Sequence, residues 1–171
     1  MNFEYMSQPP KRYTFEQPKL RLWTEGWCKD SALVLNLFAG KTKLSVNETR
    51  VDINPDMPAD YHMDAFDFIS SWKGKKFDVI LLDPPYNVRK SREKYKVGEK
   101  TFYIGKLKKI KDSIHNILNK DGIIIHFGYD SVGMGKQRGF KKIGICLVCH
   151  NGDHNDTICV VDKFTSYQMT F

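Results

Sequence analysis

The sequence has no long apolar run and few cysteines, and both absences narrow the kind of protein it encodes. Its longest apolar stretches, such as 145–149, are far shorter than the roughly 18 residues that a membrane-spanning helix needs. The 4 cysteines are too few and too unevenly spaced for a disulfide framework. Residues 1–12 contain two prolines and lack the apolar core of a secretory signal. We therefore expect a cytoplasmic protein with reduced thiols and no contact with a membrane.

Repeats, low-complexity tracts and long linkers are also absent from the 171 residues. A chain of this length buries enough apolar surface to fold without support from disulfides or metals. We therefore expect one domain over 1–171, in which 1–30 forms an N-terminal segment before the first strand of the sheet.

What the sequence does have is an excess of positive charge that lies in one place. Lys and Arg number 27, Asp and Glu number 20, and the net charge is +7. The segment 89–111 holds 10 basic and 2 acidic residues, which leaves 17 basic and 18 acidic residues for the rest of the chain. Such a run is either a solvated helix face or a site for a polyanion.

Apolar runs alternate along the chain with segments of helical period, which is typical of an α/β protein. Several runs are apolar on both faces, as strands covered by helices on both sides require. The expected strands are 32–38, 49–53, 61–63, 77–82, 123–127, 142–150 and 157–164. The expected helices are 15–27, 65–72 and 102–118.

The connections between these runs predict how the strands are arranged. Helices between successive strands favour a doubly wound, Rossmann-like and largely parallel sheet of about seven strands. The turn-rich stretch 151–156 predicts a terminal hairpin whose last strand is antiparallel. Only about 11 residues separate Gly40 from Asp52, fewer than a crossover with a full helix needs, so the first crossover helix is expected to be short or missing.

Small or acidic residues follow four of the expected strands, where a doubly wound sheet binds its ligand. Gly40 lets the backbone approach a ligand closely. The Asp52 carboxylate can accept two hydrogen bonds from a ribose diol, although capping of the following turn is a structural alternative. Asp64 can accept a hydrogen bond from an adenine amine while the backbone N–H of Ala65 donates to the ring.

The stretch Asp83-Pro84-Pro85-Tyr86 is the most specific motif. A nucleobase amine is a poor nucleophile because its lone pair is delocalised into the ring. The Asp83 carboxylate and the Pro84 carbonyl can accept hydrogen bonds from that amine and so favour its attack on a methyl donor. The two prolines stiffen the loop, and Tyr86 can stack on the base.

These motifs, in this order, resemble the class I S-adenosylmethionine-dependent methyltransferases, and among them the amino-methyltransferases with a DPPY signature. The resemblance covers the chain from about residue 32 to its end. It implies S-adenosylmethionine as the cofactor and an exocyclic nucleobase amine as the target, with adenine N6 favoured and DNA or RNA both open. The implied catalytic residues are Asp83, Pro84, Pro85 and Tyr86. The implied cofactor-binding residues are Asn36, Phe38, Ala39, Gly40, Lys41, Thr42, Asp52, Asp64 and Ala65.

The turn after the first strand departs from the family pattern. Asn36 stands where the family carries an acidic residue, and the turn reads Gly40-Lys41-Thr42 instead of carrying several glycines. Lys41, Thr42 or the N-terminal segment are therefore the candidates to hold the methionine end of the cofactor.

The basic run begins three residues after Tyr86, where phosphates must pass if a base is to reach the site. We expect it to bind a nucleic-acid backbone. The expected contacts are Asn87, Arg89, Lys90, Arg92, Lys94 and Lys96. The stretch 87–105 is also a candidate insertion for target recognition. Otherwise the shape of an RNA, a protein partner or a homodimer would supply recognition.

Some motifs allow other interpretations. Gly40-Lys41-Thr42 ends like a nucleotide phosphate loop, but Leu35 stands where that loop needs glycine. A haem or zinc site around Cys146 and Cys149 conflicts with a strand, in which residues three apart point to opposite faces, so no metal is expected.

Two alternatives concern the whole protein. One is a nucleic-acid-binding module that kept the fold and lost activity, and the other is a methyltransferase of a protein side-chain amide. His126 is expected to pack or to hydrogen-bond near the pocket, because methyl transfer to an amine needs no strong general base.

Overall fold

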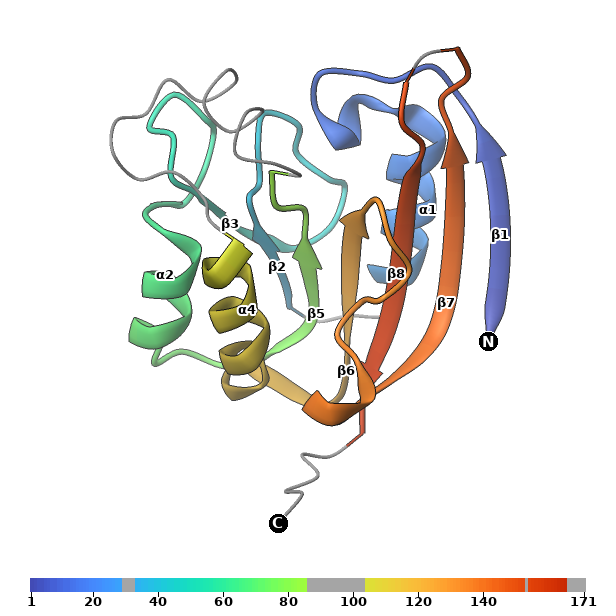
Figure 1. Cartoon of the computed structure of the whole chain (residues 1–171). Coiled ribbons are helices and arrows are strands. Elements are labelled where there is room, and N and C mark those ends of the chain that lie inside the picture. Colours follow the sequence, from blue (N-terminus) through green and yellow to red (C-terminus); the bar gives the residue numbers. More distant parts are fainter. Residues whose placement is uncertain (29–32, 86–103, 153, 166–171) are drawn as a thin grey trace.

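The computed structural model describes residues 1–28, 33–85, 104–152 and 154–165. Within them, 8 strands form one sheet in the order β1-β7-β8-β6-β5-β2-β3-β4 (Figure 1). The strands are β1 (Asn2–Ser7), β2 (Val34–Leu37), β3 (Glu48–Asp52), β4 (Tyr61–His62), β5 (Phe77–Leu82), β6 (Leu118–Gly128), β7 (Phe140–Cys149) and β8 (Thr157–Phe164). The helices are α1 (Pro18–Cys28), α2 (Ala65–Ser71) and α4 (Ile104–Ser113). Short 3-10 turns are η1 (Thr14–Glu16), η2 (Ile114–Asn116) and η3 (Lys136–Arg138).

The direction of β8 sets it apart from the other strands described. It is antiparallel to both of its neighbours, β6 and β7, whereas the remaining neighbouring pairs are parallel. The doubly wound α/β sheet with a terminal antiparallel hairpin, predicted from the sequence, is thereby confirmed. Because β2 to β6 run in one direction, their carboxyl ends share one edge of the sheet.

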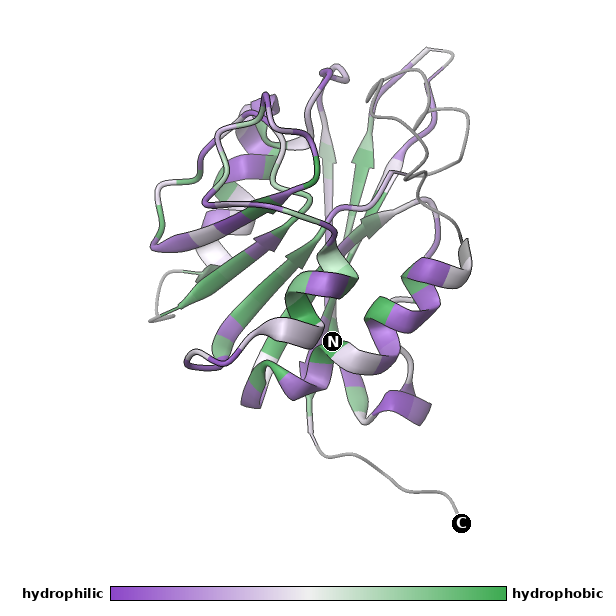
Figure 2. Cartoon of the chain, turned by 90° about the vertical axis from the view of Figure 1, so that its left-hand side faces the viewer, coloured by the Kyte–Doolittle hydropathy of each residue, from purple (hydrophilic) through white to green (hydrophobic). Residues whose placement is uncertain are grey.

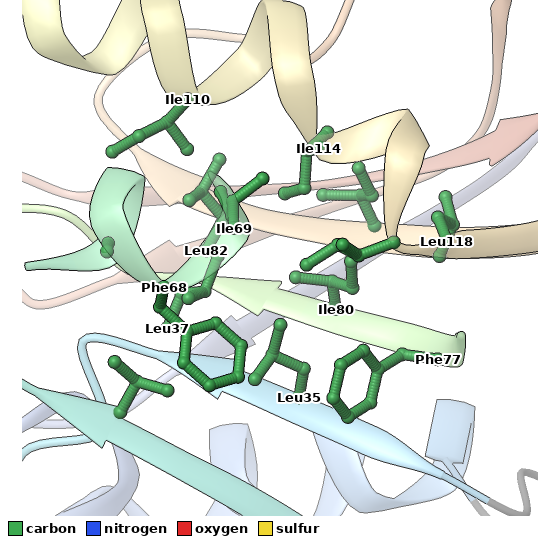
Figure 3. Close-up of a cluster of buried hydrophobic side chains, with 14 of the residues drawn as sticks. Leu35, Leu37, Phe68, Ile69, Phe77, Ile80, Leu82, Ile110, Ile114 and Leu118 are labelled. Carbon is green, nitrogen blue, oxygen red and sulfur yellow. The ribbon is translucent and has the colours of Figure 1, made fainter. Parts of the chain in front are cut away.

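Helices cover both faces of the sheet. Figure 1 shows α2 and α4 on one face and α1 on the other. Along β5, Ile80 and Leu82 pack into the core beneath α2 and α4, while Val79 and Leu81 pack into the core beneath α1. Figure 2 shows that the strands are mostly hydrophobic, and Figure 3 shows side chains of α2, α4, β2 and β5 meeting in the first core. This two-sided burial explains the nearly continuous apolar runs.

The connection from β2 to β3 contains no helix. Residues 38–47 are all described, and they form turns and irregular backbone. The missing first crossover helix predicted from the sequence is confirmed, so something other than a helix must hold this connection.

Two elements differ from the sequence-based expectation. The N-terminal segment contains a strand, β1, beside the expected helix, which raises the number of strands above seven. The helix expected over 102–118 ends earlier, at Ser113, and a 3-10 turn follows it. The chain has to leave the helix there because Leu118 already pairs with Phe77 as the first residue of β6. Among the described helices, none has the length and apolar character to cross a membrane.

Candidate functional site

The parallel strands bring the predicted motifs to one edge of the sheet. Leu37 is paired with Val51, and Asp52 is paired with His62, so β2, β3 and β4 end side by side. On the other flank of β2, Asn36 is paired with Leu81, so β5 ends there too. The turn after β2, the carboxylates after β3 and β4, and the loop after β5 therefore lie along one edge.

The turn after β2 is held against β3 by backbone bonds. The N–H groups of Phe38 and Ala39 both donate to the carbonyl of Val51, at 2.9 and 3.0 Å. Gly40 has a φ of +58°, a conformation that side chains disfavour, and a Cβ there would lie 3.2 Å from the Tyr13 ring. The glycine expected for close backbone approach is thus required for two reasons, and the N-terminal segment packs directly on the turn.

Arg50 organises the same turn from beneath. Its side chain is 2% exposed, and a guanidinium has five N–H donors. It makes five hydrogen bonds. Nε donates to the Pro58 carbonyl at 2.7 Å, and Nη1 donates to the Thr42 carbonyl at 2.9 Å and to Glu48 Oε1 at 2.6 Å. Nη2 donates to the carbonyls of Ala39 at 3.1 Å and Gly40 at 2.9 Å. Three of these bonds hold carbonyls of the connection from β2 to β3, which a crossover helix would otherwise fix, and the other two reach Glu48 and the Pro58 carbonyl after β3.

Glu48 completes this buried network. Besides Arg50, its carboxylate accepts from the backbone N–H of Leu44 (2.9 Å) and from Nδ2 of Asn36 (3.0 Å). Asn36, expected at the cofactor, is fully buried and points into this network, and its Oδ1 has no partner within the described residues. Sequence analysis missed Arg50 and Glu48. The available signal was a pair of opposite charges two residues apart, in a short strand otherwise rich in β-branched residues.

Asp52 lies at the end of β3 and is 5% exposed. Its Oδ2 accepts from the N–H of Gly40 at 2.8 Å, and its Oδ1 accepts from the N–H of Asn54 at 2.9 Å. The carboxylate therefore caps the following turn, the structural alternative weighed above, and also clamps the turn after β2. Each oxygen keeps a second lone pair, which leaves acceptor capacity for a diol.

Asp64 caps the N-terminus of α2. Its Oδ1 accepts from the N–H of Phe66 at 2.9 Å, and its Oδ2 pairs with Nζ of Lys106 on α4 at 2.8 Å. Ala65 is buried as the first residue of α2. The structure thus places both residues at the edge, with Asp64 already engaged in two interactions.

The loop after β5 begins with Asp83 and two prolines. Asp83 is half-buried, Pro84 is buried and Pro85 is half-buried. His126 on β6 is paired with Leu82, so its side chain lies beside the end of β5. Burial, together with the positive charge of Lys111, lowers the pKa of His126 to about 3. Its Nδ1 has no hydrogen-bond partner among the described residues.

The remaining predicted residues fall into two groups. Lys41 is exposed and Thr42 is half-buried, and their N–H groups make no hydrogen bond with another described residue. Tyr86 and the expected nucleic-acid contacts lie outside the described residues, namely Asn87, Arg89, Lys90, Arg92, Lys94 and Lys96. The expected insertion 87–105 also lies outside them, except for its last two residues, which begin α4.

The buried cysteine and histidine side chains of the terminal hairpin pack or form hydrogen bonds inside the protein. Cys146 is fully buried, and burial raises the pKa of its thiol to about 12. His150 is buried and bonded to the Gln8 carbonyl at 3.1 Å and to Oγ1 of Thr157 at 2.9 Å. No cluster of three or more metal-binding side chains occurs in the part of the chain that the structure describes.

The sequence matches no protein-family model and no curated protein. Solved structures with similar folds are methyltransferases. The N-methyltransferase NodS from Bradyrhizobium japonicum has a TM-score of 0.64 and 9% identity, over 91% of this chain and 99% of NodS. TrmN from Thermus thermophilus has a TM-score of 0.59 and 12% identity, over 90% of this chain and 50% of TrmN.

Similar structures also include complexes. The 1,6-didemethyltoxoflavin-N1-methyltransferase from Burkholderia thailandensis was crystallised with bound 1,6-didemethyltoxoflavin and S-adenosylhomocysteine. Its TM-score is 0.62 and its identity 12%, over 85% of this chain and 76% of that enzyme. NodS was also crystallised with S-adenosylhomocysteine. At these identities the similarity establishes the methyltransferase fold of this chain.

Proposed function

We propose that this chain is an S-adenosylmethionine-dependent N-methyltransferase that acts on an exocyclic amine of a nucleobase, with adenine N6 as the favoured target. One observation carries the proposal. The turn at Gly40, the carboxylates of Asp52 and Asp64, and the loop that begins with Asp83 meet at one edge of a sheet with a methyltransferase fold. None of these four features is specific alone, and their meeting at one edge is what supports a common site.

The residues at the turn after β2 fit the proposed cofactor. Asp52 retains acceptor positions for the ribose hydroxyls, and the N–H groups of Lys41 and Thr42 are available as donors beside a lysine side chain. These donors suit the carboxylate of the methionine end. When bound, S-adenosylmethionine supplies an electrophilic methyl group.

The loop after β5 supplies acceptors for the target amine. The Asp83 carboxylate and the Pro84 carbonyl orient the amine and draw its N–H hydrogens, which localises the nitrogen lone pair. The buried Pro84 and the adjacent Pro85 limit the motion of this backbone. Because its pKa is about 3, the His126 imidazole is neutral near pH 7 and is too weak a base to serve as one in this mechanism.

A nucleic acid is proposed as the substrate because the basic excess of the chain follows the Asp83 loop directly in sequence. A positively charged segment beside the site would hold the phosphates of a presented base. DNA and RNA remain equal candidates, and one domain performs both cofactor binding and transfer in this proposal.

The test of the reaction is methylation of mixed DNA and RNA with labelled S-adenosylmethionine, followed by identification of the methylated nucleoside by mass spectrometry. Asp83→Ala should abolish turnover and leave cofactor affinity nearly unchanged, because the carboxylate contacts the amine. Asp67→Ala, at an exposed position of α2, is the matched control. Full methylation by Asp83→Ala would show that the proposed mechanism is wrong.

The test of the substrate class is the salt dependence of nucleic-acid binding. Each phosphate neutralised adds about 0.9 to the log-log salt slope on duplex DNA, or about 0.7 on single strands. Replacing Arg89, Lys90 and Arg92 with alanine should flatten the slope and leave cofactor binding unchanged. Lys108→Ala with Lys109→Ala, at exposed positions of α4, is the control. A triple variant with an unchanged slope would favour a protein side-chain amide as the substrate.

A further inference from the structure

The sheet ends in an edge strand, β1, on the side away from α2 (Figure 1), and Nζ of Lys19 covers its Ser7 carbonyl. β1 pairs with β7 over six residues without a bulge, from Asn2 beside Gly144 to Ser7 beside Cys149. Its outer side has no neighbouring strand among the described residues. The strand contains neither proline nor lysine, the residues with which monomeric proteins often guard an edge.

The backbone of β1 offers hydrogen bonds on that outer side. Peptide groups of alternate residues in a strand point to opposite sides. The N–H of Gln8 donates to the Cys149 carbonyl on β7 at 3.0 Å, so the even-numbered residues face β7. The N–H and C=O groups of Phe3 and Tyr5 therefore point away from the sheet, where another strand can pair with them.

The side chains of the same two residues extend the edge with apolar surface. Phe3 is 64% exposed and Tyr5 is 62% exposed. They lie beside the half-buried Ile145 and Leu147 of β7, on the sheet face opposite α1, and none of the four belongs to either hydrophobic core. α2 and α4 cover the far half of that face and do not reach β1 (Figure 1).

The intervening side chains of β1 turn toward α1. Met6 packs against the core on that face, and the Glu4 carboxylate accepts from Nε1 of Trp23 at 2.9 Å. β1 is therefore anchored by one row of side chains and presents the other row, Phe3 and Tyr5, together with an open backbone edge.

We propose that β1 pairs antiparallel with β1 of a second copy of this chain, about a two-fold axis, to form one continuous sheet across a homodimer. A strand edge needs another strand to satisfy its backbone, and a two-fold axis brings identical edges together. The strand's own side chains are complementary in this arrangement, which is why a second copy is the fitting occupant.

The charge of Glu4 and the engaged carbonyl of Ser7 select the register of this pairing. Glu4 is the charged side chain of β1, and a register with Phe3 opposite Tyr5 would place the two Glu4 carboxylates opposite each other. A shift of two positions in one direction places Tyr5 opposite Tyr5 and needs the Ser7 carbonyl, which already accepts from Nζ of Lys19 at 3.0 Å. The shift in the other direction places Phe3 opposite Phe3 of the second copy. Asn2 then lies opposite Glu4, and Met1 opposite Tyr5, so an amide meets a carboxylate and apolar residues meet each other.

The two-fold axis reverses the strand direction, so the candidate sites of the two copies lie at opposite edges of the joined sheet. The dimer does not complete either site, and a protein without methyltransferase activity would still dimerise. The dimer and the proposed function therefore fail or succeed in separate experiments.

The first test is sedimentation of the full chain at increasing concentration. The wild-type chain should form a dimer, and Phe3→Lys should raise the dissociation constant at least about tenfold because it places two ammonium groups opposite each other. Leu22→Lys, at a 65% exposed position of α1, is the matched control and should dimerise like the wild type. A monomer at every concentration, or a dimer unaffected by Phe3→Lys, would overturn the proposal.

The second test fixes the register by disulfide formation in a Cys149→Ser background, because Cys149 is the native cysteine that is not buried. Opposite residues in an antiparallel hydrogen-bonded pair have Cα atoms about 5.5 Å apart, within the range of a disulfide. Phe3→Cys should cross-link two copies under mild oxidation, and Tyr5→Cys should not. The reverse result would overturn the proposed register, and cross-linking of neither would overturn the pairing.

Discussion

The two halves of the carboxyl edge are built by different means. At the ends of β2, β3 and β4, buried charges are satisfied by internal hydrogen bonds, such as the five of Arg50 and the two of Asp52. At the ends of β5 and β6, Pro84 and His126 are buried, and Nδ1 of His126 has no hydrogen-bond partner among the described residues. The first half uses most of its buried polar groups to hold its own backbone, with Asn36 Oδ1 as an exception, whereas the second half buries a neutral imidazole.

The difference shows how a fold can lose a helix and keep a site. A crossover helix would satisfy the backbone after β2 by its own ladder of hydrogen bonds. Here the buried guanidinium of Arg50 satisfies the carbonyls of Ala39, Gly40 and Thr42, and Glu48 neutralises it. A buried ion pair seldom adds net stability, but it fixes one arrangement, because any other leaves a charge without a partner. The turn is thus specified by electrostatics.

The largest expected effect comes from removing Arg50 from the buried network at the ends of β2 and β3. Arg50→Met should lower the free energy of unfolding by about 3–5 kcal/mol in urea denaturation, because it leaves the Glu48 carboxylate buried and unpaired. Adding Glu48→Gln should recover part of that loss. Arg138→Met removes an exposed pair with Asp112 and should cost less than about 1 kcal/mol. A loss in Arg50→Met no larger than in Arg138→Met would contradict the role of the network.

The next effect separates the two roles of Asp52, which are to hold the backbone of the turns and to bind the cofactor. Asp52→Ala removes charge-assisted hydrogen bonds of roughly 1.5–3 kcal/mol and should weaken S-adenosylmethionine binding about ten- to a hundredfold in calorimetry. Asp56→Ala, at an exposed position of the following loop, should bind normally. Unchanged affinity in a folded Asp52→Ala would leave the carboxylate with its turn-capping role alone.

At the ends of β5 and β6, the buried His126 should make the stability of the protein depend on pH. The folded protein holds the pKa of His126 at about 3 against an ordinary 6.5, so the unfolded chain binds a proton that the folded protein does not. Stability from this group is complete above pH 6.5 and falls as the pH drops toward 3. Between about pH 7.5 and 5.5 the loss should be about 1.4 kcal/mol.

His126→Gln should remove that part of the pH dependence, whereas His62→Gln, at an exposed position, should keep it. Denaturant unfolding of both variants at the two pH values measures the difference. Equal pH dependence in His126→Gln and the wild type would contradict a buried, neutral imidazole beside β5.

The smallest effect concerns the pair between Asp64 and Lys106, which joins the start of α2 to α4. Lys106 is 31% exposed, so Lys106→Met should cost only about 0.2–1 kcal/mol, and less at high salt. Lys108→Met, on the exposed side of α4, serves as the control. A loss well above 1 kcal/mol would mean that this contact supports the edge as strongly as Arg50 does.

The parts of the site that could be predicted from the sequence are those with a local signature. Gly40, Asp52 and Asp64 each lie at or just after the end of a segment that can be recognised as a strand, and parallel pairing then places them at one edge. Arg50 and Glu48 could not be assigned a role, because the carbonyls they hold are fixed by the path of a loop without a periodic pattern. The double engagement of Asp64 also depends on Lys106, 42 positions away.

The sequence by itself determined the order of the main strands and helices from α1 onward, the antiparallel hairpin and the missing crossover helix. Hydrophobic period, turn residues and loop length are properties of neighbouring residues, so they can be deduced without knowledge of the fold. Only the tertiary structure decided that β1 joins the sheet beside β7, from Asn2 with Gly144 to Ser7 with Cys149. Only the tertiary structure, likewise, buried Arg50 under the turn and lowered the pKa of His126. Pairing between the ends of a chain and the desolvation of a charge depend on which distant segments meet, and no local pattern encodes that.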